Sequence, residues 1–367
     1  MINNKILRIA ATLVASVILL VCCGAAVDHP DWPPSLPPFS AAPSATQMVD
    51  EFEAVSGHHP GFRRNHAKGL CISGQFQSNG NAAEVSSAAF FKSGSYPVIG
   101  RLSIVGGDPA MADARGNLRS LALQMKADDA TWKTSMNSIP VFPVNTPEAL
   151  FEQLRASVPD PQTGHTDPMK LQAFRDQHPE TQAFRDWLEQ HPPSSGYDNG
   201  TYYSVNAFRF VDEQGQAHTV RWSLEPQTPY KPQTAMIDTN DPDTLSYSLA
   251  ARLEQSPARW NLIITIAEPG DPSTDATRLW PAERRRIDAG VLVVDIQQSQ
   301  VDGPCRDIDF NPLVLPAGIQ PSDDPLLLAR AAAYAESRKR RVLESASPHR
   351  DHRQPSTAAH FDAFYPY

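Results

Sequence analysis

One histidine lies in a basic segment near the start of the chain, in a setting suited to acid–base chemistry. The segment runs from Arg63 to Gly69, has His66 at its centre, and leads into an apolar run. Imidazole has a reference pKa of about 6.5, so it can both accept and donate a proton near neutral pH. His66 is therefore a candidate acid–base group, although a histidine beside arginines can also serve only as a structural hydrogen-bonding residue.

Near the other end of the chain, Arg330 and Tyr334 form a second candidate site for chemistry. Residues four apart on a helix share one face, with Cβ atoms about 5–6 Å apart. The arginine can hydrogen-bond the phenolic oxygen and favour its anionic form, but a metal must supply the remainder of that effect at neutral pH. An arginine and a tyrosine on an ordinary exposed helix face would show the same spacing.

Composition limits the classes of partner. Acidic residues outnumber basic ones by 41 to 32, for a formal net charge of −9. A protein that binds nucleic acid through its phosphates needs a basic surface, so no nucleic-acid partner is expected. The chain also holds 34 prolines, which disfavour an all-helical bundle because proline removes a backbone donor and breaks helix interiors.

The elements that must position these residues are mainly strands. Apolar alternation and short apolar runs predict strands at 70–76, 97–105, 118–125, 202–210, 217–224, 260–266 and 291–296, with 140–144 closing the first strand-rich part and a hairpin turn at Gln214-Gly215. Helices are predicted at 45–55, within 146–189 and at 326–341, the last with Ser322 as its N-cap. His66 then precedes a strand, and Arg330 and Tyr334 lie on the last helix.

The N-terminal region predicts export. Lys5 and Arg8 precede an uncharged segment at 9–27, so residues 1–26 read as a signal peptide, with a retained membrane anchor as the alternative. Residues 27–45 form a proline-rich linker, and residues 345–367 are expected to be disordered. The expected location is periplasmic or secreted, or anchored to the membrane by residues 9–27. After the leader only Cys71 and Cys305 remain, and the sequence does not show whether they pair.

Five segments occur in the order found in haem catalases, and the chain resembles the short, exported catalase-related peroxidases. The segments are 63–69, 101–103, 277–281, 316–322 and 330–334, and the resemblance covers roughly residues 56–341. It implies an α+β fold: a catalase-like antiparallel β-barrel core with surrounding helices, within residues 46–344. The long C-terminal helical domain of full-size catalases is expected to be missing.

The resemblance also implies roles for individual residues. His66 matches the distal histidine that moves the peroxide proton, and Ser103 matches a serine that hydrogen-bonds it. Tyr334 matches the proximal haem ligand, a ligand type known for catalase, and Arg330 matches the arginine that holds it. The cofactor implied is haem b, with its iron. Cations for its propionates are expected at Arg63, Arg101 and Arg341.

One position departs from the family pattern. An asparagine is expected above the iron, just before a Pro-apolar-Phe segment. Ungapped alignment places Ser138 there and puts Asn137 one residue early. Asn137 is taken as the donor if the chain shifts slightly; Ser138 is the alternative, and it is shorter.

The expected function is that of a haem peroxidase that uses hydrogen peroxide and organic hydroperoxides together with an unidentified organic reductant. A membrane partner is expected only if the N-terminal segment is retained. Two alternatives remain open: a non-catalytic haem carrier on the same barrel, and a haem-dependent isomerase of fatty-acid hydroperoxides.

Overall fold

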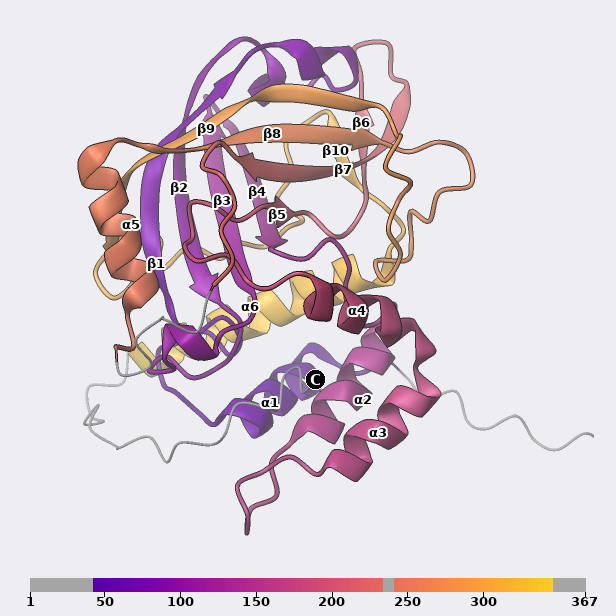
Figure 1. The fold of residues 1–367 in the computed structure, drawn as a ribbon. Helices are drawn as coiled ribbons and strands as arrows, with labels where there is room; N and C mark the ends of the chain where they lie inside the picture. The colour runs from indigo at the N-terminus through magenta and orange to yellow at the C-terminus, as the bar shows by residue number, and fades with distance from the viewer. Residues whose placement is uncertain (1–41, 234–240, 346–367) are drawn as a thin grey trace, which may run out of the picture. The chain divides into compact units, whose positions relative to one another are not determined.

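The computed structural model describes residues 42–233 and 241–345, and its centre is a closed antiparallel β-barrel (Figure 1). Eight strands form the ring in the order β7-β5-β4-β3-β2-β1-β9-β8, and pairing of β7 with β8 closes it. Strands β6 and β10 extend the sheet beyond β7. The strands are β1 Gly69–Ser78, β2 Gly94–Ile104, β3 Arg119–Ala127, β4 Ala130–Asn137, β5 Tyr202–Tyr203, β6 Phe208–Val211, β7 Ala217–Pro226, β8 Ala258–Ile266, β9 Arg286–Ser299 and β10 Ile319–Pro321.

Strand alternation fills the barrel interior with apolar side chains. Along β1, Leu70, Ile72 and Phe76 are almost fully buried in the main core. Facing strands add Trp132 and Trp222, whose rings meet edge to face with centroids 5.3 Å apart. Because successive side chains on a strand point to opposite faces, the residues between these apolar positions lie on the outside of the barrel.

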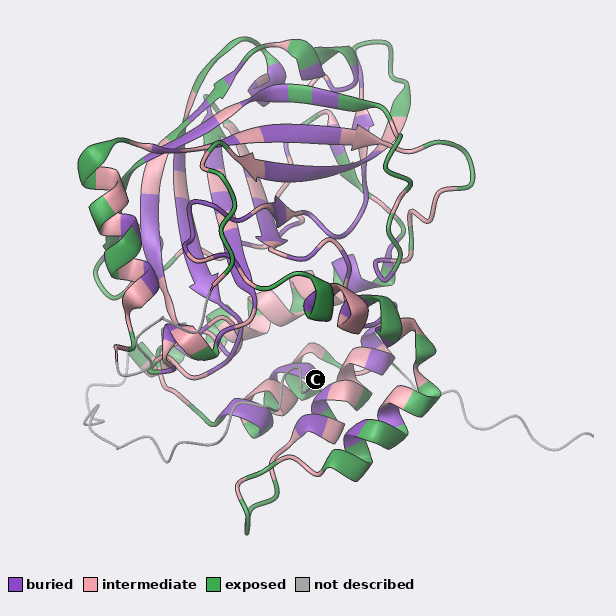
Figure 2. Ribbon diagram, viewed as in Figure 1, coloured by how far each residue is buried: buried purple, intermediate pink, exposed green. Residues whose placement is uncertain are grey.

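Helices surround the barrel, and one of them lies close beneath it. Figure 1 shows α6 crossing below the barrel, with α1 and α2 on its other side. The α-helices are α1 Ala45–Ser56, α2 Pro147–Ser157, α3 Pro168–Gln177, α4 Gln182–Gln190, α5 Thr244–Gln255 and α6 Pro325–Ser345. Burial is concentrated in the barrel strands, whereas α3 and α5 expose much of their surface (Figure 2). Within residues 42–233 and 241–345, no helix combines the length and the apolar character needed to span a bilayer.

The predicted α+β class, with an antiparallel barrel core and surrounding helices, is confirmed. Several details were wrong. Residues 140–144 form no strand, and 202–210 contains two short strands instead of one. The predicted helical region 146–189 is confirmed, as α2, α3 and α4. Strand β4 and helix α5 were missed. The proposed signal peptide at 1–26, almost all of the linker at 27–45, and the tail beyond residue 345 lie outside the described residues.

Candidate functional site

The strand register gathers several candidate residues on the outer face of the barrel. Cross-strand pairing of β1 to β4 forms two adjacent rows, which are Gly69, Ser103, Ser120 and Asn137 in the first and Cys71, Arg101, Ala122 and Ser135 in the second. Ser103 and Asn137 therefore lie in one row, and Arg101 lies in the next. Met136, beside Asn137 on β4, lines the small cavity inside the barrel instead.

His66 sits in a strained turn just before β1. Its backbone φ is 55°, in the left-handed region that non-glycine residues rarely adopt. The Asn65 side chain supports this turn, since its Oδ1 accepts hydrogen bonds from the backbone N–H of His66 (2.9 Å) and of Gly106 (3.1 Å). Ala67 N–H also donates to the Gly106 carbonyl, at 2.8 Å. Strain of this kind is often retained at functional sites, where the surroundings hold it in place.

The imidazole of His66 is held neutral. Burial, followed by the positive charges of Arg101, Arg330 and Arg63, lowers the pKa of His66 to about 3. Its Nδ1 atom is buried and has no hydrogen-bond partner among the described residues. The hydrogen bond expected from Ser103 is therefore not formed here. A neutral imidazole with a free nitrogen can accept a proton.

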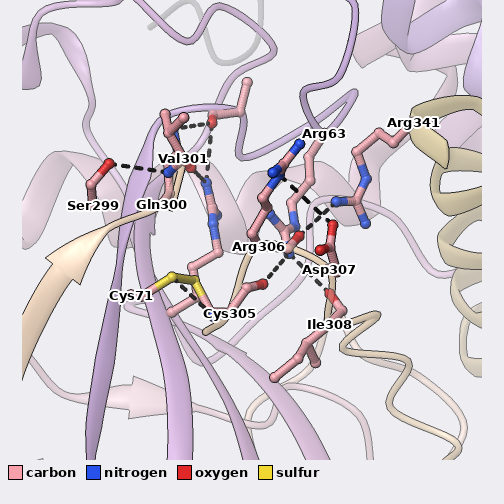
Figure 3. Close-up of a disulfide and its surroundings, with 12 residues drawn as sticks. Arg63, Cys71, Ser299, Gln300, Val301, Cys305, Arg306, Asp307, Ile308 and Arg341 are labelled. Atoms are coloured by element: carbon pink, nitrogen blue, oxygen red, sulfur yellow. Dashed lines mark hydrogen bonds and ion pairs between the residues drawn. A yellow bond between two sulfur atoms is a disulfide. The ribbon is translucent and has the colours of Figure 1, made fainter. Parts of the chain in front are cut away.

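Arg63 and Arg341 direct their guanidinium groups to backbone carbonyls on the loop that follows β9 (Figure 3). Arg63 Nη2 donates to the carbonyl oxygens of Cys305 (3.1 Å) and Ile308 (3.0 Å). Arg341 Nη1 donates to the carbonyl of Arg306, at 3.0 Å. The structure forms a Cys71–Cys305 disulfide beside these contacts, which answers the pairing question that the sequence left open.

Arg101 completes a cluster of three cations. Its Nη2 donates to the Ala67 carbonyl (3.1 Å) and to Gln300 Oε1 (2.5 Å), next to His66. The guanidinium lies over Gly69, where an added Cβ would come within 2.7 Å of Arg101 Nη2. A glycine at this position therefore permits the close approach.

Among the described residues, none of the three arginines forms an ion pair with a carboxylate. Burial, followed by the charges of Arg101 and Arg341, places the pKa of Arg63 well below its usual value. Burial also lowers the pKa of Arg101 to about 10 and lowers that of Arg341, although Asp309 is near enough to act against the shift in Arg341. Buried cations without anionic partners are costly, so this cluster suits an anionic guest.

The opposite wall of the site is provided by α6. Tyr334 packs against a cluster that contains Phe310 and Cys305. The same tyrosine acts electrostatically on Arg63 and Arg101, which also act on His66. The structure therefore gathers the histidine, the arginines and the tyrosine around one region.

Arg330 is anchored by residues that sequence reasoning missed. Its Nη1 donates to Asn206 Oδ1 and its Nη2 to the Ser135 carbonyl (3.2 Å), and no hydrogen bond joins it to Tyr334. Asn206 Nδ2 in turn donates to Asp324 Oδ2, at 2.7 Å. Asp324 also caps α6, because its Oδ1 accepts from Leu326 N–H at 2.9 Å.

The predicted N-cap at Ser322 was wrong by two residues, since α6 begins at Pro325 and Asp324 supplies the cap. Ser322 instead accepts a hydrogen bond from Asp324 N–H, at 3.3 Å. The Asp-Pro pair was a usable signal, because proline favours the first helical position and aspartate favours the position before it.

The structure distinguishes the environments of Asn137 and Ser138. Ser120 Oγ donates to Asn137 Oδ1 at 2.7 Å, which orients the amide while its nitrogen makes no hydrogen bond to a described residue. Ser138 Oγ accepts from Arg119 N–H at 3.0 Å, and its own N–H donates to the Arg119 carbonyl. Asn137 therefore has a free donor on the outer face of β4, whereas Ser138 is tied to the start of β3.

These residues fit a haem group. The three arginines carry positive charge that could neutralise its carboxylates, and Tyr334 has a phenolic oxygen of the kind that ligates haem iron. The neutral, unpartnered His66 and the free amide of Asn137 supply polar groups for a small ligand. The fit rests on groups of this chain that lack partners among the described residues: the three arginines without ion pairs, His66 Nδ1 and the amide nitrogen of Asn137.

The chain is similar to known catalases and catalase-related proteins. A family model described as Catalase matches residues 45–349. The catalase-related peroxidase of Synechococcus elongatus is 35% identical over 298 residues, covering 81% of this chain and 88% of that protein. The catalase-related peroxidase of Mycolicibacterium paratuberculosis is 29% identical over 300 residues, covering 81% and 94%.

Solved structures show the same fold. A fungal catalase matches with a TM-score of 0.71 at 20% identity, over 78% of this chain and 61% of the catalase. Catalase A of Saccharomyces cerevisiae matches with a TM-score of 0.69 at 20% identity, over 83% and 68%. The chain thus spans less than two thirds of the fungal catalase. At this identity the likeness shows the fold alone.

Proposed function

The chain belongs to the catalase family, and from this premise we propose that it is a haem-dependent peroxidase that reduces hydrogen peroxide and organic hydroperoxides. One observation carries the proposal. The outer face of the barrel, the segment before β1 and α6 bring together a neutral histidine, a tyrosine and three arginines, and among the described residues these arginines form no ion pair with a carboxylate. Such a set of residues serves a planar, anionic cofactor better than it serves folding stability.

The residues divide the work of holding the cofactor. Tyr334 would hold the haem iron through its phenolic oxygen, from a helix whose start is fixed by Asp324. Arg63, Arg101 and Arg341 bind the carboxylates of haem b through charge-assisted hydrogen bonds. When bound, haem iron supplies the redox chemistry that cleaves the peroxide O–O bond.

The chain's own groups handle protons and orientation. His66 accepts a proton from the bound peroxide and returns it to the departing oxygen, for which a neutral imidazole is required. Asn137 donates its amide N–H to the peroxide, while Ser120 holds the amide in place. An organic reductant of unidentified structure completes the cycle.

Export of the protein is part of the proposal, with residues 1–26 as the signal or 9–27 as a retained anchor. The Cys71–Cys305 disulfide supports it, because disulfides persist mainly in oxidising compartments. Cell fractionation and N-terminal sequencing of the mature protein test the location. A full-length protein in the cytoplasmic fraction would contradict it.

Activity is tested on the full chain loaded with haem, by following its absorption spectrum, peroxide loss and dye oxidation. We expect His66→Ala to lose about 100-fold or more in turnover, since general acid–base catalysis contributes factors of that size. His59→Ala is the matched control, because among the described residues the His59 side chain hydrogen-bonds only the nearby Ser56 carbonyl, at 3.1 Å. If wild-type protein binds haem but consumes no peroxide, the chain is a carrier. If it consumes lipid hydroperoxide without oxidising dye, it is an isomerase.

The ligand assignment has its own test. Tyr334→Phe should retain much less haem and lose the absorption bands of a tyrosinate-ligated iron. Tyr247→Phe is the control, since Tyr247 is exposed on α5. Equal haem retention and unchanged spectra in both variants would refute Tyr334 as the ligand.

A further inference from the structure

The loop after β9, residues 300–308, is tied to the barrel by the disulfide; we call it the Cys305 loop. Cys71 on β1 and Cys305 are 234 residues apart in sequence, and both are fully buried. Cys305 N–H also donates to Cys71 Sγ at 3.1 Å. Figure 3 shows the disulfide next to the carbonyls that receive Arg63 and Arg341.

The Cys305 loop contacts all three arginines of the cationic cluster. The carbonyls of Cys305 and Ile308 accept from Arg63, and that of Arg306 accepts from Arg341. At the other end of the loop, Gln300 Oε1 accepts from Arg101, while Gln300 Nε2 donates to the Ala67 carbonyl at 3.1 Å. Separate parts of one short loop therefore orient three guanidinium groups that come from β2, α6 and the segment before β1.

The loop packs tightly where the disulfide holds it. A Cβ at Gly303 would lie only 2.8 Å from Cys71 Sγ and 2.4 Å from the Ser299 carbonyl. Cys71 is itself the cross-strand partner of Arg101 in the register of β1 and β2. The disulfide thus fixes the loop at the strand position that carries one of the arginines.

The three arginines repel one another, so something must hold their spacing. The segment 301–318, which contacts Arg63 and Arg341, contains no regular helix or strand, so its own secondary structure does not hold it in place. We propose that the Cys305 loop, anchored by the Cys71–Cys305 disulfide, is a positioning element that sets the spacing of Arg63, Arg101 and Arg341 for the carboxylates of haem. This inference rests on the proposed haem function and adds a role for residues that do not touch the reacting atoms.

The test compares haem, which has two carboxylates, with its dimethyl ester, in which both carboxylates are replaced by uncharged methyl esters. Haem and haem dimethyl ester are titrated spectrophotometrically into wild type and into the double variant Cys71→Ser/Cys305→Ser. We expect the double variant to bind haem about tenfold or more weakly, a typical loss when residues that support a bound group are removed. Binding of the dimethyl ester should be nearly unchanged, because it lacks the charges that the arginines recognise.

A matched control separates the loop backbone from its side chains. Arg306→Ala keeps the carbonyl that accepts from Arg341 and removes only an exposed side chain. It should bind both ligands like wild type. Mass spectrometry of the peptide that joins Cys71 to Cys305 establishes that the wild-type disulfide is present.

Several outcomes overturn the inference. A haem affinity unchanged in the double variant does so, and so does an equal loss for haem and its ester in a double variant that is folded, because the loop would then not act through the carboxylates. If the double variant does not fold, Gln300→Ala decides: it should weaken haem binding selectively, and equal effects on both ligands refute the role. Failure of wild type to bind haem refutes the proposed function instead, and the inference with it.

Discussion

Arg63 and Arg64 are adjacent in sequence, as are Arg340 and Arg341, but among the described residues one arginine in each pair contacts carboxylates and the other does not. In the part of the chain that the structure describes, Arg63 and Arg341 donate hydrogen bonds only to backbone carbonyls, and burial lowers the pKa of each. Their sequence neighbours differ. Although burial opposes the shift, hydrogen bonds to Glu344 and Glu53 raise the pKa of Arg64. Burial also opposes the shift in Arg340, but its hydrogen bonds and ion pairs with Asp50, Glu336 and Glu53 raise the pKa of its guanidinium.

The difference separates structural cations from binding cations. The paired network joins α1, the segment before His66 and the end of α6, so it holds the site together. Within the described residues, the cluster of Arg63, Arg101 and Arg341 has no such link to a carboxylate, which is why we propose that its charge serves the carboxylates of haem. Adjacent arginines in the sequence, such as Arg63 and Arg64, therefore differ in whether they contact a carboxylate.

The largest expected effect separates the two groups by stability. Arg64→Met should lower the free energy of unfolding by about 2–4 kcal/mol, because it removes the buried guanidinium that pairs with Glu53 and Glu344. Among the described residues, Glu53 then keeps only Arg340 as a cationic partner, and Glu344 keeps only His58 and the Gly61 N–H. Arg63→Met should cost less than about 1 kcal/mol, since the lost hydrogen bonds are offset by relief of like-charge repulsion. Urea unfolding of the haem-free protein measures both. Equal losses would show that the two arginines do not differ in this way.

An intermediate effect extends the comparison to histidines. The pKa of His66 is lowered, so the unfolded chain binds a proton there first as pH falls, and the folded state loses stability below about pH 6.5. Between about pH 6.5 and pH 5 this amounts to roughly 2 kcal/mol. Unfolding of haem-free wild type and His66→Gln across this range tests it. The variant should show a shallower loss, and an identical slope would contradict the assignment.

His178 provides the opposite sign as a control. Although burial opposes the shift, hydrogen bonds to Glu180 and Glu152, each 2.9 Å long, raise the pKa of His178. Its contribution to stability is therefore present at low pH and is lost as pH rises through the folded-state pKa. His178→Gln should abolish a gain in stability that develops as pH falls from the raised folded-state pKa to about 6.5, and it should leave the slope below about pH 6.5 largely unchanged, where His66→Gln makes the loss shallower.

The smallest expected effect is on the haem affinity of variants at Arg340 and Arg341. Arg341→Ala should weaken haem affinity by about tenfold, the scale of one lost charge-assisted hydrogen bond. Arg340→Ala should change it by less than about threefold, because its guanidinium is engaged by carboxylates. Equal losses in spectrophotometric titrations would mean that pairing with carboxylates does not decide which arginines bind the cofactor.

Local patterns predicted part of this arrangement. Alternation along the strands was enough to place Arg101 and Ser103 on one face, and helical spacing placed Tyr334 near Arg330. The contacts of Arg330 with Asn206 and of Arg101 with Gln300 join residues 124 and 199 positions apart, and no local pattern contains them. The contrast between Arg63 and Arg64 was equally hidden, because two adjacent arginines look alike until the partners of each are known.

The missed elements have local explanations. Strand β4 carries Lys133 among its apolar residues, and that lysine donates to the Asp309 carbonyl at 2.7 Å. Helix α5 buries only Leu245 and Leu249, so its apolar face is narrow. In both cases contacts with the rest of the fold, rather than local propensity, decide the element.

The pairing of β1 also has a consequence for synthesis. Its partner on one side, β2, follows directly along the chain, but its other partner is β9, so that Leu70 pairs with Ser299. A growing chain therefore carries an unpaired strand edge beside an apolar face until most of the protein has been made. Such edges recruit other chains, and pairing across such distances is slow. Yield of the folded protein should then depend on how well a chaperone shields the nascent first half.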